Sequence, residues 1–383
     1  MRPRGLITFL ALVCIILAGW HYYLWMRLVR DMALPDPWRD VATIAIAALG
    51  ALILFALLAR RALPHAIVLP LTWVVFTWMG TAFLLFALLI AADLAGVLLA
   101  LLPGASPIDP RWLGSSIIVA ATALALVALA RARPASIRVK HVDVPLGKLS
   151  AGAHGYRIAQ ISDLHIGPTV GQQFVEHVVA RVNALQSEMI VITGDLVDGS
   201  IEKLGALAAP LANLRARDGV YFITGNHEYY SGQVDGWLDW LEARGIRVLR
   251  NERIPIGGAE GFDLAGVHDW AGSRQGNGHG TNLERALAGR DEARALVLLA
   301  HQPRLIHLAE RLGVDLQISG HTHGGQLFPF NLIVKLFQPH IAGLYSHGRA
   351  RLYVNRGTGH WGPPMRLWEH SEITAIRLQV IAG

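Results

Sequence analysis

The chain has 383 residues, of which 53% are hydrophobic, and its mean hydropathy of +0.39 excludes a wholly soluble protein. Its formal net charge of +6 lies entirely in residues 1–138, which hold 11 Arg or Lys and 5 Asp or Glu, whereas residues 139–383 hold 23 of each. Because the second part has no block of basic residues, we expect no nucleic-acid partner, and the single Cys14 excludes a disulfide within the chain.

The distribution of apolar runs and histidines also changes at residue 138. Residues 1–138 contain four long apolar runs and two histidines, while the other fifteen histidines lie in residues 139–383. We therefore predict a transmembrane region of about four helices over residues 1–138. Residues 139–383 show β-branched runs of strand length between amphipathic stretches, which predicts an α/β domain.

The four apolar runs cover residues 6–26, residues 41–59, part of residues 66–102, and residues 113–130. Each is long enough to cross a hydrocarbon core of about 30 Å. A cleaved signal peptide is the competing interpretation of the first run, but the run lacks a clear small-residue cleavage site and more such runs follow it. In the third run, Pro70 and Asp93 suggest a helix of ordinary length flanked by interfacial turns. Asp93 is either a functional intramembrane carboxylate or, as its late position favours, an acid near the membrane surface.

Basic residues at the ends of the runs predict the orientation, because cytoplasmic loops carry an excess of Arg and Lys. With four spans, eight basic residues fall on the side of the C-terminal domain and four on the other. We therefore predict a protein of the plasma (inner) membrane with its C-terminal domain in the cytoplasm, although a fifth span hidden in the third run would reverse this. The eight are Arg2, Arg4, Arg60, Arg61, Arg131, Arg133, Arg138 and Lys140, and the four are Arg27, Arg30, Arg39 and Arg111.

Polar residues follow five apolar runs of the second part, often behind a glycine that allows a tight turn. The runs are residues 156–161, 189–193, 220–224, 295–300 and 316–319. Open α/β sheets bind ligands at the carboxyl ends of their strands, so these polar residues are candidates for one site. In chain order they are Asp163 and His165, Asp195 and Asp198, Asn226 and His227, His301, and His321 and His323.

Taken singly, these residues have ordinary explanations. Asp195 could be a helix N-cap, Asn226 a turn residue and His301 a core histidine. Together they form a mixed nitrogen and oxygen donor set, which suits divalent Mn, Fe or Zn. No Gly-x-x-x-x-Gly-Lys loop is present, so nucleotide triphosphate motor chemistry is unsupported.

Five motifs in this order resemble the signature of the calcineurin-like metallophosphoesterases. They are Asp-x-His, Gly-Asp-x-x-Asp, Gly-Asn-His-Glu, a single histidine and Gly-His-Thr-His, within residues 157–326. The resemblance implies a four-layer αββα sandwich and two divalent metal ions (Mn, Fe or Zn). It implies that Asp163, His165 and His323 bind one metal, that Asn226, His301 and His321 bind the other, and that Asp195 bridges them. His227 would be catalytic, facing the phosphoryl group without binding metal. Glu228 stands where the family often has Asp.

Residues 324–326 and 357–364 resemble the membrane-attached branch of that family. The implied function is a membrane-anchored metallophosphoesterase that hydrolyses a phosphoester or pyrophosphate bond, for example as a manganese-dependent phosphodiesterase. The tether beside the lipid bilayer favours a lipid-linked substrate. Soluble nucleotides or phosphoproteins are alternatives, and so is a catalytically silent scaffold, although a scaffold would be expected to lose a ligand or His227. A transporter finds no support, because apart from Asp93 the helices hold hardly any ionisable residues except at their ends.

Residues 327–337 follow the last motif and are too apolar for an ordinary surface loop. One interpretation is a segment of the core, since apolar runs are more often packed than exposed. The other is a hydrophobic lip that meets the bilayer or an acyl chain, with Lys335 reaching the headgroups. The apolar members of such a lip would be Phe328, Phe330, Leu332, Leu336 and Phe337.

Overall fold

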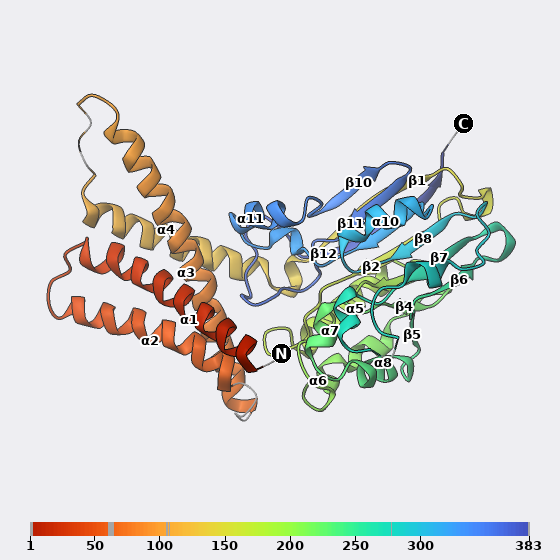
Figure 1. Ribbon diagram of the computed structural model, residues 1–383, viewed down its shortest axis with the longest axis horizontal. Helices are drawn as coiled ribbons and strands as arrows, with labels where there is room; N and C mark the ends of the chain where they lie inside the picture. The colour runs from red at the N-terminus through yellow and green to blue at the C-terminus, as the bar shows by residue number, and fades with distance from the viewer. Residues whose placement is uncertain (1–2, 60–64, 105, 107, 277, 382–383) are drawn as a thin grey trace. The chain divides into compact units, whose positions relative to one another are not determined.

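The computed structural model describes residues 3–59, 65–104, 106, 108–276 and 278–381 (Figure 1). The chain forms two compact units, one of Met1–Leu129 with Gly362–Met365 and one of Ala130–Trp361 with Arg366–Gly383. The functional domain boundary after residue 138 remains a prediction.

In the part of the first unit that the structure describes there are four α-helices: α1 (Pro3–Trp25), α2 (Trp38–Ala59), α3 (His65–Ala100) and α4 (Pro110–Arg131). A π-helical turn, Met26–Arg30, continues α1. All four are long and apolar enough to cross a membrane, so this is a membrane protein. Among the basic residues used to predict the orientation, Arg2, Arg60 and Arg61 lie outside the described residues.

The prediction of an ordinary-length third helix flanked by turns is wrong. α3 is one continuous helix of 36 residues that includes both Pro70 and Asp93. Pro70 lies in the second turn, so its missing N–H removes one hydrogen bond near the helix start. Asp93 accepts a hydrogen bond of 2.6 Å from the Tyr23 hydroxyl and pairs with Arg27, so its carboxylate is satisfied within the helix bundle. One continuous helix gives one crossing, which favours four spans over five.

The second unit contains two six-stranded sheets. The first has the order β1 (Arg138–Leu146), β12 (Glu372–Val380), β2 (Arg157–Ile161), β3 (Met189–Ile192), β4 (Val220–Phe222) and β5 (Ile246–Val248). The second has the order β10 (Gly343–His347), β11 (Ala350–Val354), β9 (Leu316–Ser319), β8 (Leu296–Leu299), β7 (Phe262–Gly266) and β6 (Glu252–Ile256). Strands β2 to β5 are mutually parallel, and so are β7, β8, β9 and β11.

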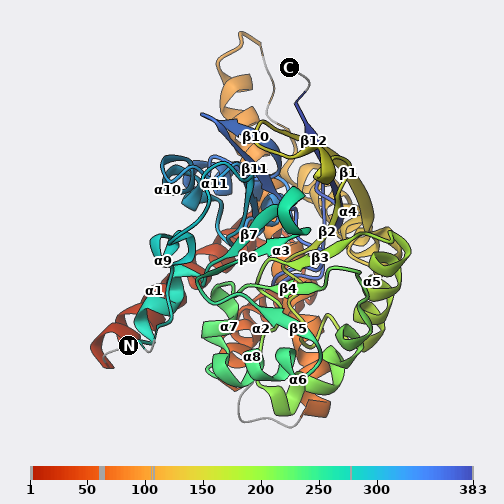
Figure 2. The same cartoon turned by 90° about the vertical axis from the view of Figure 1, so that its right-hand side faces the viewer.

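Within the described residues, seven α-helices accompany the two sheets of this unit. They are α5 (Gln172–Ala184), α6 (Ile201–Ala208), α7 (Asn226–Tyr230), α8 (Val234–Glu242), α9 (Leu283–Leu287), α10 (Ile306–Arg311) and α11 (Phe330–Phe337). In Figure 2, α8 lies beside β5, and α10 contacts β11 on the other sheet.

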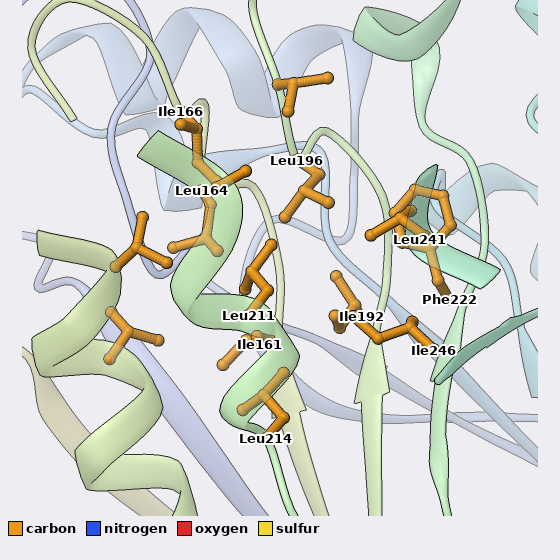
Figure 3. Packing of buried hydrophobic residues seen from close by; sticks show 14 of the residues in the cluster. Ile161, Leu164, Ile166, Ile192, Leu196, Leu211, Leu214, Phe222, Leu241 and Ile246 are labelled. Carbon is orange, nitrogen blue, oxygen red and sulfur yellow. The ribbon is translucent and has the colours of Figure 1, made fainter. Parts of the chain in front are cut away.

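Alternating side chains place each sheet between two apolar layers. On β8, Val297 points into the core between the sheets, whereas Leu296 and Leu298 pack against α9 and α10. On β3, Val191 faces the core between the sheets and Ile192 faces the helices on the other side. Figure 3 shows this outer cluster, where residues of β2, β3 and β4 meet those of the helical layer. The order of layers is helices, sheet, sheet, helices, which is the predicted αββα sandwich.

Candidate metal centre

The predicted ligands lie just beyond the carboxyl ends of β2, β3, β4, β8 and β9. Three of these strands are parallel neighbours in the first sheet, and the other two are parallel neighbours in the second. The side chains that follow them are buried or half-buried. Their nitrogen and oxygen atoms converge into groups that could hold a metal ion.

One group consists of Asp163, His165 and His323. The Nε2 atoms of the two histidines are 3.0 Å apart, and the His323 Nε2 lies 3.6 Å from a carboxylate oxygen of Asp163. All three side chains are buried. His323 is 160 positions from Asp163 and 158 from His165 in the sequence, and it meets them only because β2 and β9 belong to facing sheets.

A second group consists of Asp195, His301 and His321. The His301 Nε2 lies 3.2 Å from the Asp195 Oδ2 and 3.2 Å from the His321 Nδ1. The Asn226 side-chain oxygen is also 3.2 Å from this Nε2. The same Asp195 Oδ2 lies 3.8 Å from the His165 Nε2 of the first group, so Asp195 stands between the two groups.

These residues fit the two divalent ions that the family implies. Two nitrogen atoms that bind one ion at about 2.0–2.1 Å lie roughly 3 Å from each other, which matches the separations of the imidazole nitrogens in both groups. Imidazole, carboxylate and amide oxygen together suit Mn, Fe or Zn. The Asp195 carboxylate lies near histidine nitrogens of both groups, so it is placed to be shared by two ions.

Hydrogen bonds outside the two groups fix the orientation of the histidine rings. The His301 Nδ1–H donates to the Thr193 carbonyl at 2.7 Å, so the His301 Nε2 is the ring nitrogen left to bind a cation in place of its proton. The His165 Nδ1 lies 3.0 Å from an Asp198 carboxylate oxygen, which frees the His165 Nε2 in the same way. Metal-binding histidines commonly have such partners. The sequence pattern included Asp198 but gave it no role.

His227 lies at the edge of the two groups. Its Nδ1 is 2.7 Å from the same Asp198 oxygen that holds His165, and its backbone N–H donates to the Asp195 Oδ1 at 2.9 Å. The rings of Tyr230 and Trp361, both exposed, have centroids 5.3 Å and 6.4 Å from that of His227. The ring of His227 is therefore held by one carboxylate and bordered by two aromatic side chains.

The backbone at the site is strained. Asp163, His165, Asp195, His321 and His323 have φ angles between 51° and 75°, a region that residues other than glycine rarely adopt. Such strain persists only where surrounding contacts enforce it, and it is concentrated at functional sites. One such contact joins the Asp163 carboxylate to the His321 N–H, at 2.9 Å.

Glycines at the site leave room for the carboxylates. A Cβ atom on Gly320 would lie 2.2 Å from the Asp163 Oδ2, and one on Gly225 would lie 2.2 Å from the Asp195 Oδ1. Both distances are too short for any side chain. The glycines in the Gly-His and Gly-Asn motifs are therefore required by the close approach of these carboxylates.

The charges of the site shift the pKa values of its groups. Burial would raise the pKa of Asp195, but His301 and His227 hold it well below the usual value. Burial also lowers the pKa of His227, but Asp195 and Asp198 outweigh this and raise it to about 9 in the metal-free chain. Burial, assisted by the charge of His301, lowers the pKa of His321 to about 3. His321 is therefore neutral at neutral pH and keeps a nitrogen lone pair for a cation.

Glu228 has a role that the sequence did not reveal. Its buried carboxylate accepts hydrogen bonds from the N–H groups of Gly225 (2.6 Å), Leu196 (2.7 Å) and Asp195 (3.0 Å). It thus connects the turn after β3 to the turn after β4. Burial and the charge of Asp195 raise the pKa of Glu228 to about 7.

Replacing Glu228 with Ala should lower the free energy of unfolding of this unit by about 3–5 kcal/mol, because it leaves three buried N–H donors without their acceptor. Glu228→Gln keeps one acceptor oxygen at the same length and should lose less. The measurement is the melting temperature of the detergent-solubilised chain, with bound metal assayed in parallel. Equal melting temperatures for Glu228→Ala and the unsubstituted chain would contradict this role.

Arg366 is the second residue that the sequence did not single out. Its guanidinium is buried and donates to the carbonyl groups of Gly359 (2.6 Å), Arg356 (2.7 Å) and His323 (3.3 Å). It therefore supports the His323 turn through the backbone. Burial lowers the pKa of Arg366 to about 10, so the group stays charged at neutral pH.

Comparison with known proteins places the chain in a family. The family model described as calcineurin-like phosphoesterase matches residues 156–325. A Danio rerio protein named "Transmembrane protein with metallophosphoesterase domain" is 40% identical over 250 residues, which are 63% of this chain and 57% of that protein. An "Uncharacterized metallophosphoesterase" of Aquifex aeolicus (strain VF5) is 35% identical over 245 residues, which are 63% of this chain and 92% of that protein.

Among solved structures, a dimetal phosphatase from Danio rerio is 12% identical with a TM-score of 0.35, covering 53% of this chain and 88% of that chain. That similarity is too low to add to the argument. The match to the Danio rerio transmembrane protein spans little more than half of its length. The Aquifex aeolicus relative, in contrast, is covered over nearly its whole length. With the family model matching all five motifs, the chain belongs to the calcineurin-like phosphoesterase family.

Proposed function

We propose that this chain is a membrane-anchored phosphoesterase that depends on two divalent metal ions and hydrolyses a phosphoester or pyrophosphate bond. The observation that carries the proposal is the convergence of two donor groups around Asp195, with His227 at their edge. The ligands would be Asp163, His165 and His323 for one ion and Asn226, His301 and His321 for the other, with Asp195 shared and His227 catalytic. A silent scaffold would have no need of this arrangement.

The chemistry follows from the charge of the substrate. Two bound divalent ions would supply a hydroxide nucleophile at neutral pH and neutralise phosphoryl oxygens. The protein positions the other groups. Asp198 accepts from the His227 Nδ1–H, so the His227 Nε2 can carry the proton that the departing alkoxide needs. In the metal-free chain Asp195 and Asp198 raise the pKa of His227, which supports a role as a proton donor. Asp195, held ionised by its histidine neighbours, offers negative charge to both ions.

We further propose a lipid-linked phosphoester as the substrate. The chain carries its own membrane helices, which keep the site close to lipids. The exposed rings of Tyr230 and Trp361 beside His227 offer an apolar surface where a leaving group would lie. A soluble nucleotide or a phosphoprotein is the second candidate, because the same rings could stack on a base or a side chain.

Removal of metal should abolish hydrolysis. A chelator-treated chain is expected to lose at least roughly 10³-fold in activity toward an aryl phosphodiester and to regain it with Mn, Fe or Zn, because neutral water attacks an anionic phosphate poorly. The same assay on a phosphomonoester, a phosphodiester and a lipid pyrophosphate ranks the substrate classes. Full activity in a chain shown to be metal-free by elemental analysis would refute the mechanism.

We propose that the phosphoesterase unit lies in the cytoplasm, at the plasma (inner) membrane. Eight basic residues on its side against four on the other support this orientation. A reporter that is active only in the cytoplasm, fused after residue 383, should therefore be active. A silent reporter there, together with activity of a periplasmic reporter at the same position, would reverse the assignment.

A further inference from the structure

The helix α11 has several apolar side chains that are exposed on this unit. None of its eight residues is buried, which rules out the interpretation of residues 327–337 as a core segment, although Leu327 itself is buried. The exposed fractions of Leu336 and Phe337 reach 81% and 76%. A contiguous apolar surface of this kind marks an interaction site.

The exposed side chains form one face of the helix. At about 100° per residue they fall within an arc of about 160°, and Lys335 lies about 60° outside this arc. The opposite side of the helix is fixed to the metal-site turn, because a Cβ atom on Gly325 would lie 2.3 Å from the Asn331 Cα. The outward-facing members are Phe330, Leu332, Ile333, Leu336 and Phe337.

Aromatic residues extend this face beyond the helix start. Phe328 precedes α11 and is exposed, and its ring lies 5.6 Å from the ring of Trp368, which is 70% exposed. The N–H of Phe328 donates to the Leu367 carbonyl at 3.2 Å, which holds the two segments together. Exposed tryptophan beside aliphatic side chains is typical of the membrane–water interface. We call Phe328, Trp368 and the outward residues of α11 the apolar face.

A pocket lies at the other end of α11. Its volume is about 420 Å³, and Phe337 of the apolar face contributes to its wall. The pocket can present a guanidinium and two imidazole groups to an anion, and none of the described residues that line it is acidic. Its other lining residues are Arg304, His307, Gln338, Pro339 and His340. With Lys335 nearby on the helix, positively charged groups therefore border the apolar face.

We propose that the apolar face docks on the phospholipid bilayer in which the chain itself is anchored, and that the pocket takes a phospholipid phosphate group. An amphipathic helix of this kind lies in the interface with its apolar side in the acyl boundary. Lys335 and Arg304 would reach the phosphate layer, as long cationic side chains do. The apolar area thus meets acyl chains, and the cationic groups meet anionic headgroups.

The tether favours lipid over a protein partner. α4 ends at Arg131 and β1 begins at Arg138, and seven residue steps span at most about 25 Å. A bilayer is therefore always within short reach of this unit, whereas a protein would have to be recruited. The proposal does not depend on phosphoesterase activity, because none of these residues belongs to the metal groups.

The test uses the full chain reconstituted in phosphatidylcholine vesicles with about a third phosphatidylglycerol, a fraction that supplies anionic charge for the cationic groups. The only cysteine is removed by Cys14→Ser, which changes an exposed side chain. A polarity-sensitive fluorophore is then placed by Leu336→Cys or, as the matched control, by Asp239→Cys on α8. Nitroxide groups on the lipid acyl chains should quench the label at 336 roughly twofold or more relative to the label at 239.

Two further variants make the result specific. Phe337→Ser should reduce the quenching at 336, because it removes an exposed member of the apolar face. Arg304→Gln should remove the increase in quenching that phosphatidylglycerol produces over phosphatidylcholine alone.

Equal quenching at 336 and 239 would overturn the docking proposal. If the lipid nitroxides do not quench the label at 336, and the label instead becomes more shielded from water as the protein concentration rises, the apolar face contacts a second copy of the chain and the docking proposal is wrong. An unchanged phosphatidylglycerol effect in Arg304→Gln would overturn the pocket assignment.

Discussion

Replacing Asp195 with Asn is expected to abolish hydrolysis, with a loss of at least roughly 10³-fold, and to empty both metal positions. Asp195 is the one carboxylate between the two groups, since its Oδ2 lies 3.2 Å from the His301 Nε2 and 3.8 Å from the His165 Nε2. The amide has the same shape, but it loses the negative charge and replaces one acceptor oxygen with an NH₂ donor. Its hydrogens would point toward the cations.

The measurement combines activity on an aryl phosphodiester with metal content by elemental analysis. Asp239→Asn is the matched control, because it makes the same chemical change on the exposed surface of α8 and should leave both readouts unchanged. His323→Ala should resemble Asp195→Asn in activity while affecting the first group directly. If Asp195→Asn keeps both metals and its turnover, Asp195 is not the shared ligand and the proposed centre is wrong.

Replacing His227 with Ala is expected to lower kcat by about 10²- to 10⁴-fold while both metals stay bound. The His227 Nδ1 is engaged by Asp198 at 2.7 Å, which leaves the Nε2 for the leaving group. A general acid matters most when the leaving group is a poor one. The loss should therefore be larger for an alkyl phosphodiester than for a nitrophenyl phosphodiester.

The metal content of this variant decides between two roles. A His227 nitrogen also falls into one possible metal-binding group with His165 and Asp195, so the geometry alone allows ligation. Retained metal with lost turnover supports catalysis, whereas lost metal would make His227 a ligand. His141→Ala, an exposed histidine on the edge strand β1, is the matched control and should change neither quantity. A loss that is the same for both leaving groups would exclude proton donation and leave charge stabilisation.

Local patterns in the sequence were sufficient for the membrane helices, the strands and the family. Apolar runs of membrane-spanning length predicted α1 to α4, since only helices satisfy their own backbone groups in lipid. Alternating or continuous apolar runs predicted β2, β3, β4, β8 and β9, and the polar residues after them predicted which side chains meet. Parallel strands in one sheet present their carboxyl ends at one edge. Residues that follow these strands directly in the sequence are therefore expected to lie close together in the fold.

Only the tertiary structure decided how those residues are supported and which apolar residues stay exposed. The contacts of Glu228 with the turn after β3, and of Asp198 with two histidines, join residues about 30 positions apart, which no local pattern encodes. Similarly, the carboxylate of Asp93 accepts a hydrogen bond from Tyr23 on another helix of the bundle. The helix α3 continues through Asp93, where the sequence suggested a turn. For α11 the sequence did not distinguish a core segment from an exposed lip, because the order of apolar residues is the same whether protein or lipid covers them. Its exposure depends on what packs against the helix, and that is a property of the folded chain.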